Sequence, residues 1–298
     1  MYTKQNQNST KRKFQFSEHI WISILVLILL YLAFNILATI ITLILTPRQQ
    51  QMSPITLTIS LFVCYALSLF LIVPRLLHLP EGKKSLSEYL KDIRLRSSQP
   101  ILHILALGLS CYFIYMLSQL LSSLIYGQYS FDISLALPPN SWGLLQNIPF
   151  VLAEEITVRG LILTLLLKKY SEKQSILISA AIMGSYHILG LFSLDSSFSY
   201  ENLVWYSGQV VWAFIIGLFY GYTFIKAKSL LPCIMVHYLS NTLINLWVVL
   251  PAAPVELHVL YAIIFQEGII PTALSILWVR FYTSRWFPVS ESGNDLNT

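Results

Sequence analysis

Eight apolar stretches, each close to the length that crosses a bilayer, dominate this chain of 298 residues. They cover residues 20–45, 55–73, 101–125, 142–167, 175–194, 203–225, 229–250 and 258–281. A helix needs about 20 predominantly apolar residues to span the hydrocarbon core. The chain is 55% hydrophobic and 11% charged, far from the composition of a soluble domain. The sequence therefore predicts an all-α polytopic membrane bundle of about eight transmembrane helices.

The basic residues predict the orientation of this bundle, because Lys and Arg accumulate in cytoplasmic loops. If both termini are cytoplasmic, only Arg48 among the 19 basic residues lies outside and only Arg159 lies within the membrane. The other basic residues then fall in the N-terminal tail or at the inner side. Basic loops beside anionic lipid headgroups account for the net charge of +5, so we expect no nucleic-acid partner.

Three charged residues interrupt the stretch 142–167: Glu154, Glu155 and Arg159. An ionised side chain at mid-bilayer depth costs roughly 2.5–3.5 kcal/mol, so these residues should face the protein interior. Residues four apart share a face of a helix, and Glu155 is therefore predicted to pair with Arg159. Glu154 points elsewhere around the helix and must meet polar groups of other helices.

Two histidines and an asparagine are placed to meet Glu154. His187 and His237, with Asn241 one turn after His237, fall in the middle of their predicted spans. A carboxylate beside an imidazole can hold a water molecule and take its proton, while His and Asn donors stabilise the oxyanion that forms. This set predicts peptide-bond hydrolysis. Glu154, His187 and His237 could instead hold a catalytic zinc ion with one position open for water, and the sequence leaves both mechanisms open.

The same residues form three ordered motifs. EExxxR runs from Glu154 to Arg159, an aromatic-xxx-His motif runs from Met183 to His187 with Met in place of the usual Phe, and HxxxN runs from His237 to Asn241. Together, over about residues 142–250, they resemble the type II CAAX prenyl endopeptidases and their bacterial relatives. These relatives are the bacteriocin-processing or CPBP intramembrane proteases, also called the Abi family.

The resemblance implies a role for each residue. Glu154 and His187 would activate the water, His237 and Asn241 would form the oxyanion hole, and Glu155 and Arg159 would support the site. It also implies an integral protein of the bacterial cell membrane that cuts a hydrophobic, lipid-modified or leader peptide, in peptide maturation or self-immunity. We expect no cofactor, because Asn241 is a poor zinc ligand and a natural amide donor, with zinc as the alternative.

Two other functions are compatible with buried charges. A protein of the same fold could act as a non-proteolytic scaffold that binds a partner such as a sensor kinase or a bacteriocin receptor complex. A proton-coupled transporter could use Glu and His as a relay, but the sequence has no visible internal repeat and no paired broken helices. The complete set of Glu154, His187, His237 and Asn241 favours the enzyme.

The chain is expected to have five parts. Residues 1–18 form a basic cytoplasmic tail, 19–141 the N-terminal transmembrane helices, 142–250 the catalytic core, 251–285 the final transmembrane helix and 286–298 a polar tail. The apolar run after residue 18 is too long for a cleaved signal peptide, so we expect a retained anchor. Within the second part, residues 81–98 fit a short amphipathic helix on the inner membrane surface.

The sequence also allows predictions for three cysteines and one further glutamate. Cys64, Cys111 and Cys233 lie inside predicted helices without metal-type spacing, so we expect no disulfide. Glu267 lies near the middle of the last helix, and we expect it to face the bundle interior. Its partner would be Arg159, Asn245 or a water-filled cavity.

Overall fold

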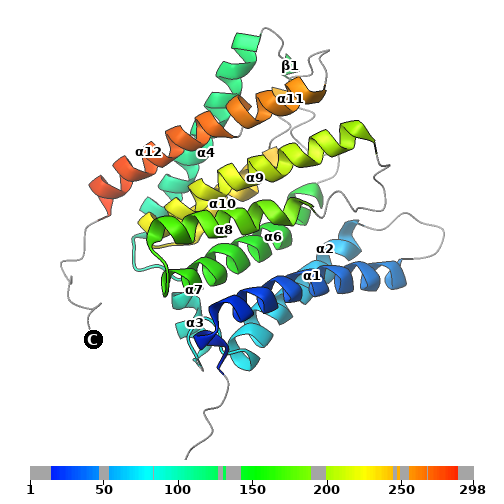
Figure 1. Ribbon diagram of the computed structural model, residues 1–298, viewed down its shortest axis with the longest axis vertical. Coiled ribbons are helices and arrows are strands. Elements are labelled where there is room, and N and C mark those ends of the chain that lie inside the picture. Colours follow the sequence, from blue (N-terminus) through cyan, green and yellow to red (C-terminus); the bar gives the residue numbers. More distant parts are fainter. Residues whose placement is uncertain are drawn as a thin grey trace, which may run out of the picture.

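The structure is a computed structural model that describes residues 15–46, 54–82, 84–126, 130–131, 142–188, 199–243, 247–248, 255–266 and 268–287. Helices make up nearly all of these residues and pack into one bundle (Figure 1). Within the described part, one short antiparallel pairing joins β1 (Ser130–Phe131) to β2 (Trp247–Val248), with Ser130 opposite Val248. The predicted all-α polytopic bundle is confirmed.

The helices follow in three groups along the chain. The N-terminal group consists of a short 3₁₀ turn η1 (Phe16–Glu18), α1 (Ile20–Leu45), α2 (Pro54–Leu67), the π-helical η2 (Ser68–Leu76), α3 (Leu86–Asp92) and α4 (Ile101–Tyr126). The middle group consists of α6 (Trp142–Glu155), the π-helical η3 (Ile156–Leu163), α7 (Thr164–Leu167), α8 (Glu172–Tyr186), α9 (Tyr200–Ala227) and α10 (Leu231–Leu243). The last group consists of α11 (Val255–Tyr261), the π-helical η6 (Ala262–Gln266) and α12 (Ile269–Trp286).

Five helical stretches of the described residues are long and apolar enough to cross a membrane. They are Ile20–Leu45, Pro54–Leu76, Ile101–Leu121, Tyr200–Ala227 and Val259–Trp286, and they coincide with five of the predicted spans. The other three predicted spans correspond to the continuous helix of α6, η3 and α7, which carries three charges, and to the shorter helices α8 and α10. The count of eight spans and the cytoplasmic placement of both termini stay predictions.

Packing places α6 and η3 among the other helices. α6 packs on α2 and α10, while η3 packs on α1, α8 and α9. Figure 1 shows α1 and α2 at one side of the bundle and α12 at the other. The outward face of α1 carries exposed large apolar side chains such as Leu25, Leu29, Ile36 and Ile44. Such a face is suited to lipid, so most of the surface of α1 needs no protein partner.

α8 and α9 approach each other closely because glycines lie at their contact. A Cβ atom added to Gly217 of α9 would lie 3.0 Å from the Cα atom of Ala180 in α8. A Cβ atom added to Gly184 of α8 would lie 2.9 Å from the main-chain oxygen of Val210 in α9. In a bilayer, small residues favour helix association because they let two backbones come together and gain dispersion contacts. The end of α8, where His187 follows, is thereby fixed against α9.

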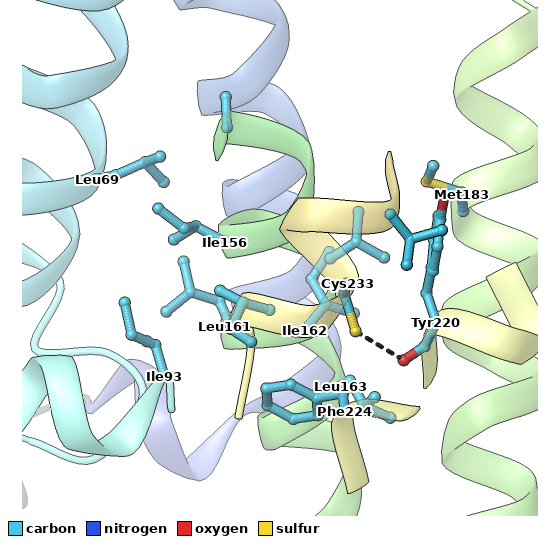
Figure 2. Close-up of a cluster of buried hydrophobic side chains, with 14 of the residues drawn as sticks. Leu69, Ile93, Ile156, Leu161, Ile162, Leu163, Met183, Tyr220, Phe224 and Cys233 are labelled. Atoms are coloured by element: carbon cyan, nitrogen blue, oxygen red, sulfur yellow. Dashed lines mark hydrogen bonds between the residues drawn. The ribbon is translucent and has the colours of Figure 1, made fainter. Parts of the chain in front are cut away.

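The π-helical η3 forms the centre of the apolar core. All eight of its residues are buried, and Figure 2 shows Ile156 beside Leu69 of η2 and Leu161 beside Ile93 after α3. A π-helix closes its hydrogen bonds over five residues instead of four, and such segments are frequent at functional sites. Here the wider turn lies directly after the two glutamates of α6.

The amphipathic helix predicted within residues 81–98 is present as α3. Ser85 begins it with a capping box, in which Glu88 N donates to Ser85 Oγ at 3.3 Å and Ser85 N donates to Glu88 Oε2 at 2.9 Å. Tyr89 and Ile93 are buried against the bundle, while the polar side chains remain outside. Its position on the inner membrane surface stays a prediction.

The structure describes three of the four remaining residues. Cys64, Cys111 and Cys233 are free and buried in the structure. The Sγ atom of Cys233 donates to the main-chain oxygen of Tyr220 at 3.3 Å (Figure 2). Glu267 and its suggested partner Asn245 lie outside the described residues.

Candidate functional site

Glu155 is the centre of a buried charged cluster. Its side chain is fully buried, and its Oε1 atom accepts hydrogen bonds from Arg159 Nη1 at 3.1 Å and from His237 Nδ1 at 2.8 Å. The predicted pair between Glu155 and Arg159 is therefore present, and His237 joins it. An ionised carboxylate only accepts hydrogen bonds, so we assign the hydrogen to Nδ1 of His237.

Arg159 is also fully buried and has a second polar neighbour. Its Nη1 atom lies 3.1 Å from the Sδ atom of Met183, and its guanidinium carbon lies 5.1 Å from the ring centre of Tyr220. Met183 occupies the motif position where the related family usually has Phe. A thioether is a weak hydrogen-bond acceptor, so this Met provides a contact to the guanidinium that a Phe side chain lacks.

His237 connects this cluster to Glu154. Its ring stacks on Tyr220, with centroids 5.4 Å apart and planes inclined by 24°, and its Nε2 atom lies 3.7 Å from Glu154 Oε2. This distance is too long for a direct hydrogen bond. One water molecule could hydrogen-bond to both atoms at once. The structure therefore places an imidazole beside Glu154, and that imidazole belongs to His237.

Glu154 differs from Glu155 in its access to the surroundings. The side chain of Glu154 is 20% exposed, whereas that of Glu155 is 0% exposed. The hydroxyl of Tyr31 in α1 donates to Glu154 Oε1 at 3.1 Å. The Tyr31 ring is stacked on Tyr65 at 5.6 Å and on Tyr186 at 5.2 Å, which holds the hydroxyl in place. Glu154 is thus an oriented carboxylate that a small molecule can reach.

The sequence interpretation did not identify Tyr31. It lies 123 positions before Glu154 and outside the three motifs. The available signal was its place in the middle of an aliphatic span, where Asn35 follows one turn later. Nδ2 of Asn35 donates to the main-chain oxygen of Tyr31 at 3.0 Å, within the same helix.

For the peptide hydrolysis that the sequence predicts, replacing Tyr31 with Phe is expected to lower kcat roughly tenfold, because the change removes one hydrogen bond to a charged carboxylate and keeps the stacked ring. A matched control is Tyr112→Phe in α4, which removes a buried hydroxyl that has no partner among the described residues. Turnover and thermal stability are measured for both variants. An unchanged kcat in Tyr31→Phe together with a lower Tm would mean that the hydroxyl only supports the fold.

His187 and Asn241 are placed differently from Glu154 and His237. The Nδ1 atom of His187 lies 3.2 Å from the main-chain oxygen of Met183, and its ring meets Trp212 edge-on at 6.1 Å. Asn241 is exposed, and its main-chain oxygen accepts a hydrogen bond from Asn147 Nδ2 at 3.3 Å. Within the described part of the chain, no direct hydrogen bond or ion pair joins His187 or the Asn241 side chain to Glu154.

The described residues do not assemble a metal site. None of them forms a group of three or more His, Cys, Asp or Glu side chains close enough to hold an ion. Zinc would need Glu154, His187 and His237 together, and among the described residues these three side chains do not gather closely enough to share an ion. The donor set in this arrangement therefore does not fit a three-ligand zinc centre.

These contacts define a class of site: an accessible carboxylate, oriented by a tyrosine and lying beside an imidazole, within a bundle of apolar helices. Groups of this kind can move a proton from water to a leaving group. Residues 138–243, which carry all three motifs, match the family described as type II CAAX prenyl endopeptidase Rce1-like.

The match is limited to this part of the chain, and it confirms the resemblance to the CPBP intramembrane proteases. Together with the apolar helices, it supports an integral membrane protein of the hydrolase class. No curated protein and no solved structure matches the chain.

Proposed function

We propose that this protein is an intramembrane endopeptidase in which Glu154 activates a water molecule to cleave a peptide bond. One observation carries the proposal: Glu154 is partly exposed, while the adjacent Glu155 is fully buried and neutralised by Arg159. Two consecutive glutamates in one helix thus have separate tasks. The family match over residues 138–243 supports the same reaction class.

The proposed reaction begins with a water molecule beside Glu154. The carboxylate takes a proton from this water as the oxygen attacks the carbonyl carbon of the substrate, and a tetrahedral oxyanion forms. The proton then passes from Glu154 to the amide nitrogen, the C–N bond breaks, and a carboxylic acid and an amine leave. Tyr31 holds one oxygen of Glu154, so the other oxygen is free to face the water.

The proposed roles of the other polar residues follow the family resemblance. His187 would assist Glu154 with the water, and His237 and Asn241 would stabilise the oxyanion as hydrogen-bond donors. The contact between His237 Nδ1 and Glu155 supports a fixed orientation of that ring, with Nε2 directed toward Glu154. Donation from Nε2 to an oxyanion requires hydrogen on both ring nitrogens.

The proposed substrate is a hydrophobic, lipid-modified or leader peptide that reaches the site from the bilayer or its inner surface. The lipid-facing apolar side chains around the bundle support a substrate that shares the membrane with the enzyme. A role in bacteriocin maturation or self-immunity, in a bacterial cell membrane, belongs to the same proposal.

We further propose that the reaction needs no metal. The purified protein is expected to contain substoichiometric zinc and to keep its activity in the presence of a chelator. Elemental analysis by mass spectrometry measures the first quantity, and cleavage after dialysis against the chelator measures the second. One tightly bound zinc ion per chain, lost together with activity in His187→Ala, would contradict this expectation.

The decisive experiment compares the termini of membrane and secreted peptides by mass spectrometry, between cells that express this protein and cells that express equal amounts of Glu154→Ala. New termini that depend on the intact carboxylate are expected, and they would name the substrate. Identical profiles, with any phenotype retained by the variant, would favour the scaffold function. Uptake that depends on a proton gradient would favour the transporter.

A further inference from the structure

A cavity rich in cations lies at the end of the bundle, away from the candidate active site. It has a volume of about 520 Å³ and is lined by Lys91, Arg94, Arg96, Ser97, Ser98 and Lys228. Four of these six side chains are cations, two carry hydroxyl groups and none is a carboxylate. Pockets for small ligands occupy roughly 300–1,000 Å³, so this cavity has room for a headgroup-sized anion.

Two loops form the cavity, and their conformations are well defined. Arg94, just after α3, and Lys228, between α9 and α10, both adopt left-handed backbone conformations, with φ of 54° and 49°. The N–H of Leu230 donates to the main-chain oxygen of Arg94 at 2.9 Å, and Ser97 Oγ donates to the main-chain oxygen of Lys228 at 3.3 Å. The loops hold each other, so their cations are brought together by the fold.

Two acids in the neighbouring helices are already engaged by other lysines. Asp92 pairs with Lys84 at 2.9 Å, and Glu172 pairs with Lys226 at 3.1 Å. Arg94 is partly buried, and its Nη1 atom donates to the main-chain oxygen of Phe224 at 3.1 Å. Its guanidinium carbon lies 4.6 Å from the centre of the Phe224 ring. Among the described residues, no ion pair involves Lys91, Arg94, Arg96 or Lys228, so none of these four cations is held by a direct contact with a carboxylate.

We propose that this cavity binds the phosphate group of an anionic membrane lipid. Lys and Arg side chains with hydroxyl groups recognise phosphate oxygens, and basic pockets between helix ends on the cytoplasmic side hold anionic headgroups. The position supports a lipid occupant, because α9 and α10, which lead away from the cavity, are spans or predicted spans, and α3 is amphipathic. An adjoining cavity of about 620 Å³ shares Lys228, but its lining differs because it also contains the carboxylate of Glu172 and apolar side chains such as Ile176 and Phe287.

The test uses the full-length protein in a neutral detergent and native mass spectrometry with added phosphatidylglycerol, phosphatidylcholine or inorganic phosphate. The triple variant Lys91→Gln, Arg96→Gln, Lys228→Gln removes three cations and leaves Arg94, which anchors the loop. A matched control, Arg75→Gln, Lys169→Gln, Arg285→Gln, removes three exposed cations outside the cavity. Thermal unfolding of both variants checks that each is folded.

The parent protein is expected to retain phosphatidylglycerol in preference to phosphatidylcholine. The cavity variant should lose roughly hundredfold in phosphatidylglycerol affinity, since each cation near an anionic surface contributes on the order of 1 kcal/mol. The control variant should bind almost as the parent does. Equal losses in both variants would overturn the proposal in favour of diffuse surface attraction. Tight retention of inorganic phosphate without a preference for phosphatidylglycerol would overturn the lipid assignment.

Discussion

Replacing Glu154 with Gln is expected to lower kcat by about 10² to 10⁴, the range that a general base contributes, while Tm changes by less than about 2 °C. The amide has nearly the same volume as the carboxyl group, and its oxygen can still accept the Tyr31 hydroxyl hydrogen. It cannot take a proton from water. Cleavage of the substrate found in the termini comparison, assayed in proteoliposomes, gives kcat, and thermal unfolding gives Tm.

The adjacent residue provides the matched comparison. Glu155→Gln also replaces a carboxyl by an amide, but it removes the charge that neutralises Arg159 in a fully buried position. It is therefore expected to destabilise the protein, whereas Glu154→Gln affects turnover alone. If Glu154→Gln retains more than about a tenth of the parent kcat, Glu154 does not act as the general base.

Replacing Arg159 with Met is expected to lower the free energy of unfolding by about 3–5 kcal/mol, the usual effect of removing one partner of a buried ion pair. Glu155 then remains fully buried, and of its two hydrogen-bond partners in the described part of the chain it keeps His237. For a chain of this size we expect Tm to fall by roughly 10 °C. Thermal unfolding in detergent, followed by tryptophan fluorescence, measures this shift.

Two further variants make this result interpretable. Lys226→Met breaks an ion pair of similar length with Glu172, but both partners are well exposed, so Tm should change by less than about 2 °C. The double variant Glu155→Gln, Arg159→Met removes both buried charges and should recover part of the lost stability. A Tm for Arg159→Met equal to that of Lys226→Met would show that the buried pair does not hold the fold together.

The contacts that the sequence predicted are mostly local. The pair between Glu155 and Arg159 follows from their spacing, because one turn of helix brings them together whatever the neighbouring helices do. The short amphipathic helix expected within residues 81–98 is also a local feature, although its start at the capping box of Ser85 and Glu88 was not predicted. Helix-forming spans are equally readable, because the bilayer demands their length and apolar composition.

The contacts that the sequence did not predict are tertiary. His237 meets Glu155 across 82 positions, and Tyr31 meets Glu154 across 123. Both depend on which faces of α10 and α1 turn toward α6. Hydropathy carries little information about those faces, since lipid is as apolar as a helix interface and burial alone drives no association there. All eight residues of η3 are buried, so its sequence has no alternation of apolar and polar residues. The π-helical winding could therefore not be predicted from periodicity.

The position of Tyr31 in α1 has a consequence for how the proposed peptidase activity evolves. The matched region begins at residue 138, yet the hydroxyl that orients Glu154 comes from α1, far before it. A gene fragment for residues 138–243 would encode both glutamates and both histidines without that donor. Recombination that exchanged the leading helices between relatives would therefore alter chemistry as well as membrane anchoring, and the two halves of the chain are expected to evolve together.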